Sequence, residues 1–267
     1  MAQRRLQPIH RAPLSRVEAV FTDVDGTLTS QGRLTGNTIK ALEWLNAHGV
    51  RVVLVTGRSA GAADTWARTL PVDGVIAENG ALFMRREGQR LRTTYLQPAR
   101  TRAAHRARLS AVIGEATTRF APAALSSDSA FTAVNLAIDI AEETALSESL
   151  VLRLERWLKT QGVTAVRSSV HINCWFGRFD KATAVKRYLA DVWGTRLRSA
   201  DPRYVYVGDS FNDQPLFRAF SLSVGVANVL DVASQLKYRP AFVTRSREGR
   251  GFGEVVDAIA RQRRNRS

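Results

Sequence analysis

The chain of 267 residues contains a single cysteine, Cys174, and has no long apolar run. One thiol can form neither an intramolecular disulfide nor, alone, a structural zinc site, so nothing indicates an oxidising compartment. The N-terminal segment 1–16 is basic but lacks the apolar stretch of a secretory signal peptide, and no segment is long and apolar enough to span a bilayer. We therefore expect a cytoplasmic protein that does not enter a membrane.

Acidic residues are scarce: 24 Asp and Glu stand against 39 Lys and Arg, which gives a formal net charge of +15. Basic proteins attract nucleic acids, anionic membranes and phosphorylated small molecules alike, so the charge narrows the partner class without choosing within it. No aromatic residues interleave with the basic ends, as stacking platforms for single strands would require. We interpret these ends as solvated tails, with nucleic-acid binding as the less favoured alternative. The arginines concerned are Arg4, Arg5, Arg11, Arg16, Arg261, Arg263, Arg264 and Arg266.

Internal repeats and low-complexity segments are also absent, and a chain of this length with 45% hydrophobic residues can bury a sizeable core. In both end segments, apolar strands alternate with amphipathic helices, which predicts a doubly wound α/β domain with a parallel sheet, built from residues 1–81 and 180–267. The predicted strands are 17–21, 51–55, 72–77, 203–207, 222–226 and 241–244. The predicted helices are 38–48, 59–70, 180–192, 213–220, one beginning at 230, and 253–261.

The middle segment, residues 82–179, departs from this alternation. It reads as strands at 82–85, 90–95, 133–140, 164–168 and 171–176, with helices at 99–120 and 144–161. That order predicts an antiparallel sheet with helices on one face, an α+β insert between the two halves of the core. Cys174 falls on one of its strands, where we expect it to pack rather than to react.

Two carboxylates, Asp23 and Asp25, follow the first core strand in the stretch VFTDVDGTLT. Ligands of open α/β sheets bind outside the carboxyl ends of the strands. Residues two apart on an extended chain point the same way, so this pair can share a divalent cation or divide the roles of nucleophile and acid or base. Gly26 then allows the backbone to approach a ligand closely.

Three further motifs stand at comparable positions. The second strand ends in Thr56-Gly57-Arg58, where a hydroxyl and the start of a helix could hold a phosphate oxygen. A later strand ends in GDSFND, residues 208–213, and clustered aspartates with glycine suit Mg²⁺. Lys181 begins the helix after the insert and supplies a compact positive charge for a phosphate.

Together, DVDGTLT, VTGR, the lysine after the insert and GDSFND resemble the four ordered motifs of the haloacid dehalogenase (HAD) superfamily. The length and position of the insert resemble the α/β caps, termed C2B, of the class IIB or Cof-like phosphatases. Phosphatases of sucrose phosphate, trehalose phosphate and mannosyl-3-phosphoglycerate share that cap type. The resemblance covers Val17 to about Ala260 and implies a Rossmann-like core with an inserted cap.

The resemblance implies that Asp23 is the nucleophile, which forms an aspartyl-phosphate and also binds Mg²⁺. Asp25 would be the general acid and then the general base, with its backbone carbonyl on the metal. Thr56 with the Gly57 amide, beside Arg58, would hold the phosphoryl group. Many relatives place glycine after the motif lysine, where this chain has alanine.

For the remaining residues, the resemblance implies that Lys181 neutralises both nucleophile and phosphate and that Asp209 is a direct metal ligand. Asp213 would act through the water shell of the metal, and Asn212 would support the phosphate or the metal. Asn79, in Glu78-Asn79-Gly80, resembles a loop on the substrate side of the family's site, but the same residues are typical of a plain turn.

These observations predict a Mg²⁺-dependent phosphatase that hydrolyses a small phosphorylated metabolite, with sugar phosphates as the favoured class. One alternative is phosphomannomutase-like phosphoryl transfer, because those enzymes also carry DVDGTLT, although their fourth motif is longer and richer in glycine. The other is a basic protein of the same fold with an RNA-binding role.

Overall fold

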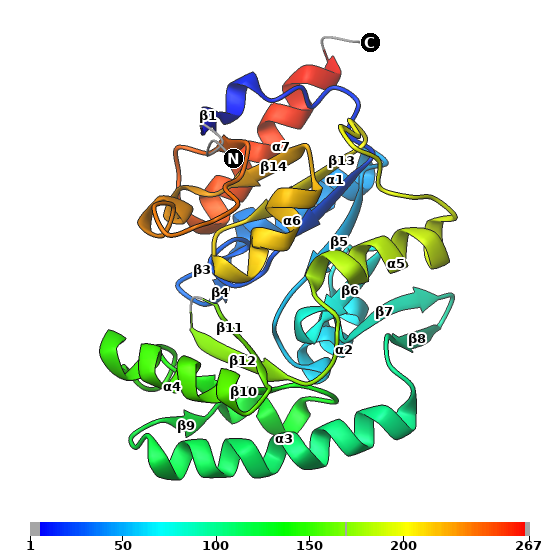
Figure 1. Cartoon of the computed structure of the whole chain (residues 1–267). Coiled ribbons are helices and arrows are strands. Elements are labelled where there is room, and N and C mark those ends of the chain that lie inside the picture. Colours follow the sequence, from blue (N-terminus) through cyan, green and yellow to red (C-terminus); the bar gives the residue numbers. More distant parts are fainter. Residues whose placement is uncertain (1–5, 169, 265–267) are drawn as a thin grey trace.

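A nine-stranded sheet forms the centre of the computed structural model, which describes residues 6–168 and 170–264 (Figure 1). Arg4, Arg5 and Arg266 lie outside these residues. Seven adjacent strands of this sheet are parallel to one another, and the last two strands at one edge pair in the antiparallel direction. In spatial order they are β1 (Gln7–Pro8), β15 (Phe242–Val243), β14 (Leu222–Gly225), β13 (Tyr204–Gly208), β2 (Ala19–Thr22), β5 (Arg51–Val55), β6 (Gly74–Ala77), β7 (Leu82–Glu87) and β8 (Arg90–Tyr95).

Helices cover both faces of this sheet. Val52 and Leu54 of β5 pack with α1 (Gly36–Ala47), α2 (Ala60–Thr69) and α7 (Glu248–Arg264), whereas Val53 and Val55 pack with α5 (Lys181–Trp193) and α6 (Gln214–Ala219). Successive strand residues point to opposite faces, so an apolar run such as RVVLV suits a strand that is buried on both sides. The predicted doubly wound α/β fold is confirmed.

The insert has its own four-stranded antiparallel sheet, in the order β11 (Thr164–Arg167), β12 (His171–Trp175), β10 (Leu136–Asp139) and β9 (Ala124–Leu125). One face packs on α3 (Ala99–Arg119), which lies below the sheet in Figure 1, and on α4 (Glu148–Thr160). Ile172 and Cys174 point to these helices, and Cys174 is fully buried, as expected of a packing residue. The alternate residues Asn173 and Trp175 therefore lie on the face toward the large sheet.

Residues 82–95 do not belong to the antiparallel sheet of the insert, contrary to the prediction. They form the hairpin β7–β8, and β7 pairs with β6 through Ala77 and Leu82 because a tight turn at residues 78–80 folds the chain straight back. Two-residue elements were also missed, since so short a pattern has no periodicity: β9 and the hairpin of β3 (Thr29–Ser30) and β4 (Arg33–Leu34).

The helix predicted to begin at residue 230 is also wrong. The segment forms the 3₁₀ helix η5 (Ala227–Asp231) instead. The adjoining residues up to β15 contain no α-helix, and Asn228 points to the carboxyl end of the sheet, where it donates to Asp209. The Asn228 side chain also bonds Gly26 and Glu248, so tertiary contacts rather than a local pattern hold this short turn.

The C-terminal arginines up to Arg264 do not form a solvated tail, contrary to the prediction. Arg261, Arg263 and Arg264 belong to α7, whose apolar face includes Phe252 and Ile259. The guanidinium of Arg263 donates to the carbonyl oxygens of His48 (2.7 Å) and Val17 (2.8 Å). This arginine therefore ties the last helix to the core, because its long side chain can reach backbone acceptors on two neighbouring segments.

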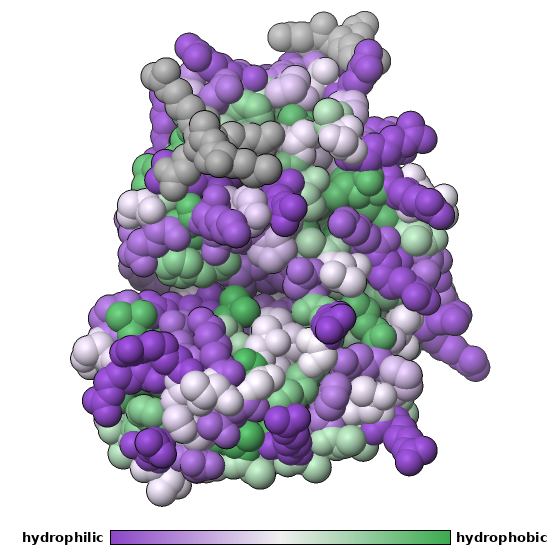
Figure 2. Space-filling view, in the orientation of Figure 1, coloured by the Kyte–Doolittle hydropathy of each residue, from purple (hydrophilic) through white to green (hydrophobic). Residues whose placement is uncertain are grey.

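Hydrophilic side chains dominate the face in Figure 2, where a crease at the left of the view lies above the insert. Two cavities, of about 730 and 660 Å³, are lined by residues of both parts. Among the described residues, no helix combines the length and the apolar character needed to cross a membrane.

Candidate active site

Asp23 is the first residue after β2, and its backbone amide donates to Val207 of β13 (2.9 Å). It continues the odd-numbered positions of β2, which face α5. The first residue of α5 is Lys181, whose Nζ lies 3.1 Å from Oδ1 of Asp23 and 2.7 Å from Oδ1 of Asp213. The side chains of all three are buried. Three segments distant in sequence thus bring one ammonium group between two carboxylates.

The loop after β13 places the other carboxylates. Oδ2 of Asp213 accepts hydrogen bonds from the backbone amides of Asp209 (2.8 Å) and Ser210 (3.1 Å), and Oδ1 accepts from the hydroxyl of Tyr206 as well as from Lys181. Both oxygens of Asp213 are therefore engaged within the protein. This carboxylate fixes the loop that carries Asp209.

Asp209 is oriented by two donors. The hydroxyl of Thr27 donates to its Oδ1 (3.0 Å), and the amide of Asn228 donates to its Oδ2 (2.8 Å) and to the carbonyl of Gly26 (3.0 Å). Asn228 thereby joins the loop after β2 to the loop after β13.

Asp23, Asp209 and Asp213 form a group that fits a divalent cation, because an oxygen of each lies within 4.8 Å of the others. Three carboxylates face one ammonium, Lys181, a formal balance of −2. Burial, followed by the charge of Asp213, raises the pKa of Asp23 to about 7. The same two causes raise the pKa of Asp209 well above its ordinary value. The cluster thus lacks positive charge, and its hard oxygen donors are those that Mg²⁺ prefers.

Lys181 remains a cation in this setting. Burial alone would lower its pKa, but the carboxylates of Asp213 and Asp23 outweigh burial and raise the pKa. A charged lysine in a buried position is strongly stabilised only by such paired and hydrogen-bonded partners.

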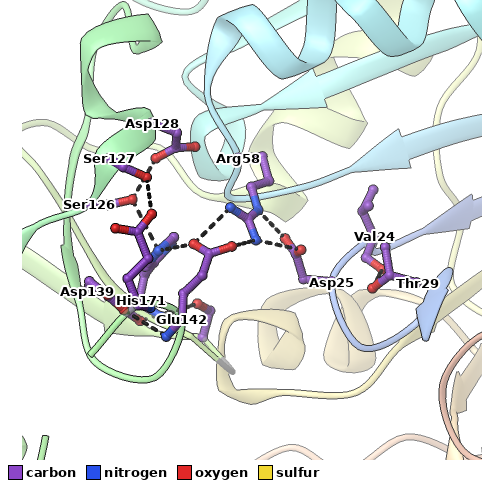
Figure 3. A network of polar contacts seen from close by, with 12 residues as sticks. Val24, Asp25, Thr29, Arg58, Ser126, Ser127, Asp128, Asp139, Glu142 and His171 are labelled. Carbon is purple, nitrogen blue, oxygen red and sulfur yellow. Dashed lines mark hydrogen bonds and ion pairs between the residues drawn. The ribbon is translucent and has the colours of Figure 1, made fainter. Parts of the chain in front are cut away.

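Asp25 lies beside this cluster and is bound by Arg58 (Figure 3). Nε and Nη2 of Arg58 each donate to one oxygen of Asp25 at 2.9 Å. The same guanidinium donates to both oxygens of Glu142 of the insert, at 3.1 and 2.6 Å. Oε2 of Glu142 lies 2.8 Å from Nε2 of His171 on β12. Arg58 therefore connects Asp25 of the core to the insert.

Thr56 and Asn79 form the other wall of the site. The Thr56 hydroxyl accepts from the backbone amide of Arg58 (3.0 Å), and the backbone amide of Asn79 donates to the Thr56 carbonyl (3.0 Å). A Cβ at Gly57 would lie 3.1 Å from Nδ2 of Asn79 and from Oδ1 of Asn173. The absence of a side chain at Gly57 thus lets β12 approach this loop closely.

Glu78 anchors the insert on the core. Its buried carboxylate accepts hydrogen bonds from the backbone amides of Ala60 in the core and of Ala133, Val134 and Asn135 in the insert, at 2.6–3.0 Å. Burial raises its pKa, although these four bonds oppose the increase. The carboxylate thereby satisfies backbone donors of both parts at once.

Every predicted site residue lies at this edge of the large sheet. Asn212 also belongs there, and its amide lies 3.5 Å from Oδ1 of Asn79. Several contributing residues were not predicted. Thr27 lies within the quoted motif DVDGTLT, Tyr206 lies on the strand before GDSFND, and Asn228 follows a predicted strand, so strand ends carried a signal for these three. Glu142 and Asn173 carried none, because their position depends on how the insert folds over the core.

A family model for haloacid dehalogenase-like hydrolases matches residues 20–110. No curated protein sequence matches the chain. The matched segment contains the first two of the four motifs, DVDGTLT and VTGR, and supports the predicted hydrolase class.

Solved structures extend the likeness to nearly the whole chain. A Thermoplasma acidophilum protein is 17% identical, with a TM-score of 0.71 over 91% of this chain and 98% of its own. The sucrose-phosphatase of Synechocystis is 18% identical, with a TM-score of 0.64 over 92% of this chain and 98% of its own. The C-terminal domain of the Candida albicans trehalose-6-phosphate phosphatase is 13% identical, with a TM-score of 0.69 over 98% of this chain and 99% of its own. At these identities the likeness establishes a shared fold.

Proposed function

We propose that this chain, whose residues 20–110 match a family model for haloacid dehalogenase-like hydrolases, is a Mg²⁺-dependent phosphatase of a small phosphorylated metabolite. The observation that carries the proposal is the buried contact of Asp23 with Lys181 beside Asp209. A carboxylate and a phosphate repel each other, so nucleophilic attack needs positive charge between them. Lys181 supplies one such charge.

In the first step, a carboxylate oxygen of Asp23 forms a bond to phosphorus while the bond from phosphorus to the substrate oxygen breaks. The electron pair of that bond leaves with the substrate oxygen, and Asp25 transfers a proton to it. Lys181, with Thr56 and the Gly57 amide, stabilises the charge on the transferring phosphoryl group. The product is an aspartyl-phosphate on Asp23 and a free alcohol.

In the second step, water attacks phosphorus, Asp25 takes the proton of that water, and the bond to Asp23 breaks to release phosphate. Asp23 and Asp209 would hold Mg²⁺ directly, with Asp213 behind them and the Asp25 carbonyl nearby. When bound, the ion supplies the positive charge that offsets the repulsion between carboxylate and phosphate. Asp213, whose oxygens already accept four hydrogen bonds, orients the loop that carries Asp209.

We further propose that residues 1–81 and 180–267 form the catalytic core and that residues 82–179 form a cap, except for the hairpin at 82–95, which extends the core sheet. The cap excludes water from the site and contacts the rest of the substrate. Sucrose-phosphatase and trehalose-6-phosphate phosphatase are among the structural neighbours, so sugar phosphates are the first substrate class to test. A cytoplasmic location belongs to the same proposal.

The test is a screen of phosphorylated metabolites with Mg²⁺, read as phosphate release. It includes sugar phosphates, phosphoglycolate, FMN and pyridoxal phosphate, together with p-nitrophenyl phosphate. We expect turnover by the wild type and none above background by Asp23→Asn, which keeps the shape of the side chain and removes the nucleophilic carboxylate. Asp64→Asn on the outer surface of α2 is the matched control and should keep full activity. Turnover by a folded Asp23→Asn protein would refute the proposed mechanism.

A further inference from the structure

The cavity of about 730 Å³ begins at the site and runs along the boundary between the core and the insert. Asn79, Lys181 and Asn212 line its inner end, so it adjoins the position proposed for the phosphoryl group. Its outer part is lined by side chains of β11, β12, α6 and the segment after η5. A substrate bound through its phosphoryl group therefore has room in this cavity for the rest of the molecule.

The wall contributed by the insert is aromatic. The ring of Trp175 stacks on that of Phe179, with centroids 5.5 Å apart and an interplanar angle of 21°. Trp175 is 2% exposed, and its indole N–H has no hydrogen-bond partner among the described residues. Asn79 is also 2% exposed, and its side-chain Nδ2 likewise has no hydrogen-bond partner among the described residues. A buried donor without an acceptor is costly, so both are free to bind oxygen atoms of a ligand.

The outer rim is basic. Arg178, Arg218 and Lys237 line it, and within the described part of the chain none of them has a carboxylate partner. Asp180 is the acidic residue that lines this cavity, and it accepts from the backbone amide of Thr183 at the start of α5. Within the described residues, no carboxylate forms an ion pair with any of these three rim cations.

Two of these cations are held in place. Oε1 of Gln214 accepts from the backbone amides of Lys237 (2.7 Å) and Tyr238 (3.2 Å), which fixes that segment beside α6. The Tyr238 ring then lies 5.0 Å from the guanidinium carbon of Arg218 and 5.5 Å from Nζ of Lys237. One ring therefore keeps both cations at the same end of the cavity.

The second cavity, of about 660 Å³, differs in this respect. Asp25 and Arg58 line it, but its other arginines are already paired: Arg167 with Glu148 at 2.9 Å and Arg247 with Asp231. Basic side chains without an ion-pair partner among the described residues are therefore a feature of the 730 Å³ cavity rather than of both cavities.

We propose that this cavity binds the leaving group of the substrate and that Arg218 and Lys237 bind a second anionic group on it, a carboxylate or a second phosphate. The inference rests on the proposed phosphatase function and specifies its substrate class. Trp175 and Asn79 would donate to oxygen atoms between the two anionic groups. A sugar phosphate without a second anionic group would make no ion pair with Arg218 or Lys237.

The experiment compares two pairs of phosphomonoesters that differ in one anionic group. These are 6-phosphogluconate with glucitol 6-phosphate, and 3-phosphoglycerate with glycerol 3-phosphate; in each pair a carboxylate replaces a CH₂OH group. In at least one pair, we expect a higher kcat/KM for the ester that also carries a carboxylate. A charge-assisted contact is worth roughly tenfold in affinity, so Arg218→Gln and Lys237→Gln should each reduce that preference by about that factor.

Lys186→Gln is the matched control, because Lys186 is an exposed cation on α5 that does not line the cavity. This variant should keep the preference for the carboxylate-bearing ester unchanged. The inference is overturned if neither pair shows a preference, or if Lys186→Gln reduces it as much as the rim variants do.

Binding to Asp23→Asn by calorimetry separates this inference from the proposed function. Tighter binding of 6-phosphogluconate than of glucitol 6-phosphate, lost in Lys237→Gln, would support the subsite even if no ester were hydrolysed. Hydrolysis of p-nitrophenyl phosphate without any such difference in binding would retain the phosphatase and reject the subsite.

Discussion

Arg58 holds Asp25 by two hydrogen bonds of 2.9 Å, one to each carboxylate oxygen. The same guanidinium contacts Glu142 of the insert, so the geometry of Asp25 depends on the docking of the insert as well as on its own loop. A planar guanidinium can make both pairs of contacts, and neither lysine nor an apolar side chain can.

We predict that Arg58→Met reduces kcat by 10- to 100-fold, because small misplacements of a proton donor cost about that much. Steady-state kinetics with p-nitrophenyl phosphate measure this. Arg68→Met is the control, since Arg68 makes a similar pair with Asp64 on the exposed face of α2. If both variants have the activity of the wild type, Arg58 does not position Asp25.

Metal removal should silence the enzyme. We expect EDTA to abolish phosphate release and added Mg²⁺ to restore it, because the cluster of Asp23, Asp209 and Asp213 lacks positive charge. Mg²⁺ should also raise the melting temperature of the wild type, since a ligand at 100 times its Kd contributes about 2.7 kcal/mol of stability. Asp209→Asn should lose both effects. Asp231→Asn, which removes an exposed carboxylate paired with Arg247, should keep them. Full turnover in EDTA would contradict a metal-dependent site.

The stability of the metal-free protein should fall as pH rises from about 4 to above 7. The pKa of Asp23 is raised from 3.8 to about 7 in the folded protein, so in this range the folded state binds more protons than the unfolded state. The unfavourable contribution is absent below 3.8 and complete above 7. Asp23→Asn removes it. We therefore expect that in EDTA the variant gains stability relative to the wild type between pH 4 and pH 8, as measured by urea unfolding. A constant difference across this range would contradict the raised pKa.

Two glycines that lie on either side of β3 provide a matched pair of variants. Gly26 and Gly32 have φ values of 72° and 75°, so alanine at either position carries a strain of about 1–2 kcal/mol. A Cβ at Gly26 would lie 2.5 Å from Oδ2 of Asp209, whereas a Cβ at Gly32 would have nothing within 4 Å. We expect Gly26→Ala to reduce kcat/KM by about 100-fold, the usual cost of a misplaced group in a catalytic site, and Gly32→Ala to leave it within about twofold. Equal activity of the two variants would show that Asp209 tolerates displacement.

The core elements were predictable because their signals are local. The strand 51–55 has the predicted bounds, and Ser59 and Asp180 cap α2 and α5 at the predicted helix starts. Apolar runs and capping residues act within a few residues of themselves, so they are visible in one dimension. The hairpin β7–β8 was assigned to the wrong sheet, since its pairing partner is a property of the folded chain.

The sequence by itself determined that Asp23, Thr56 and Asp209 stand at the ends of buried parallel strands, and such ends meet at one edge of a sheet. Only the tertiary structure decided that Glu142 reaches Arg58, that Asn173 lies over Gly57, and that Arg218 and Lys237 share the ring of Tyr238. The physical reason is range: each of these contacts joins segments whose relative position is set by the packing of the insert or of distant loops, and no local pattern encodes it.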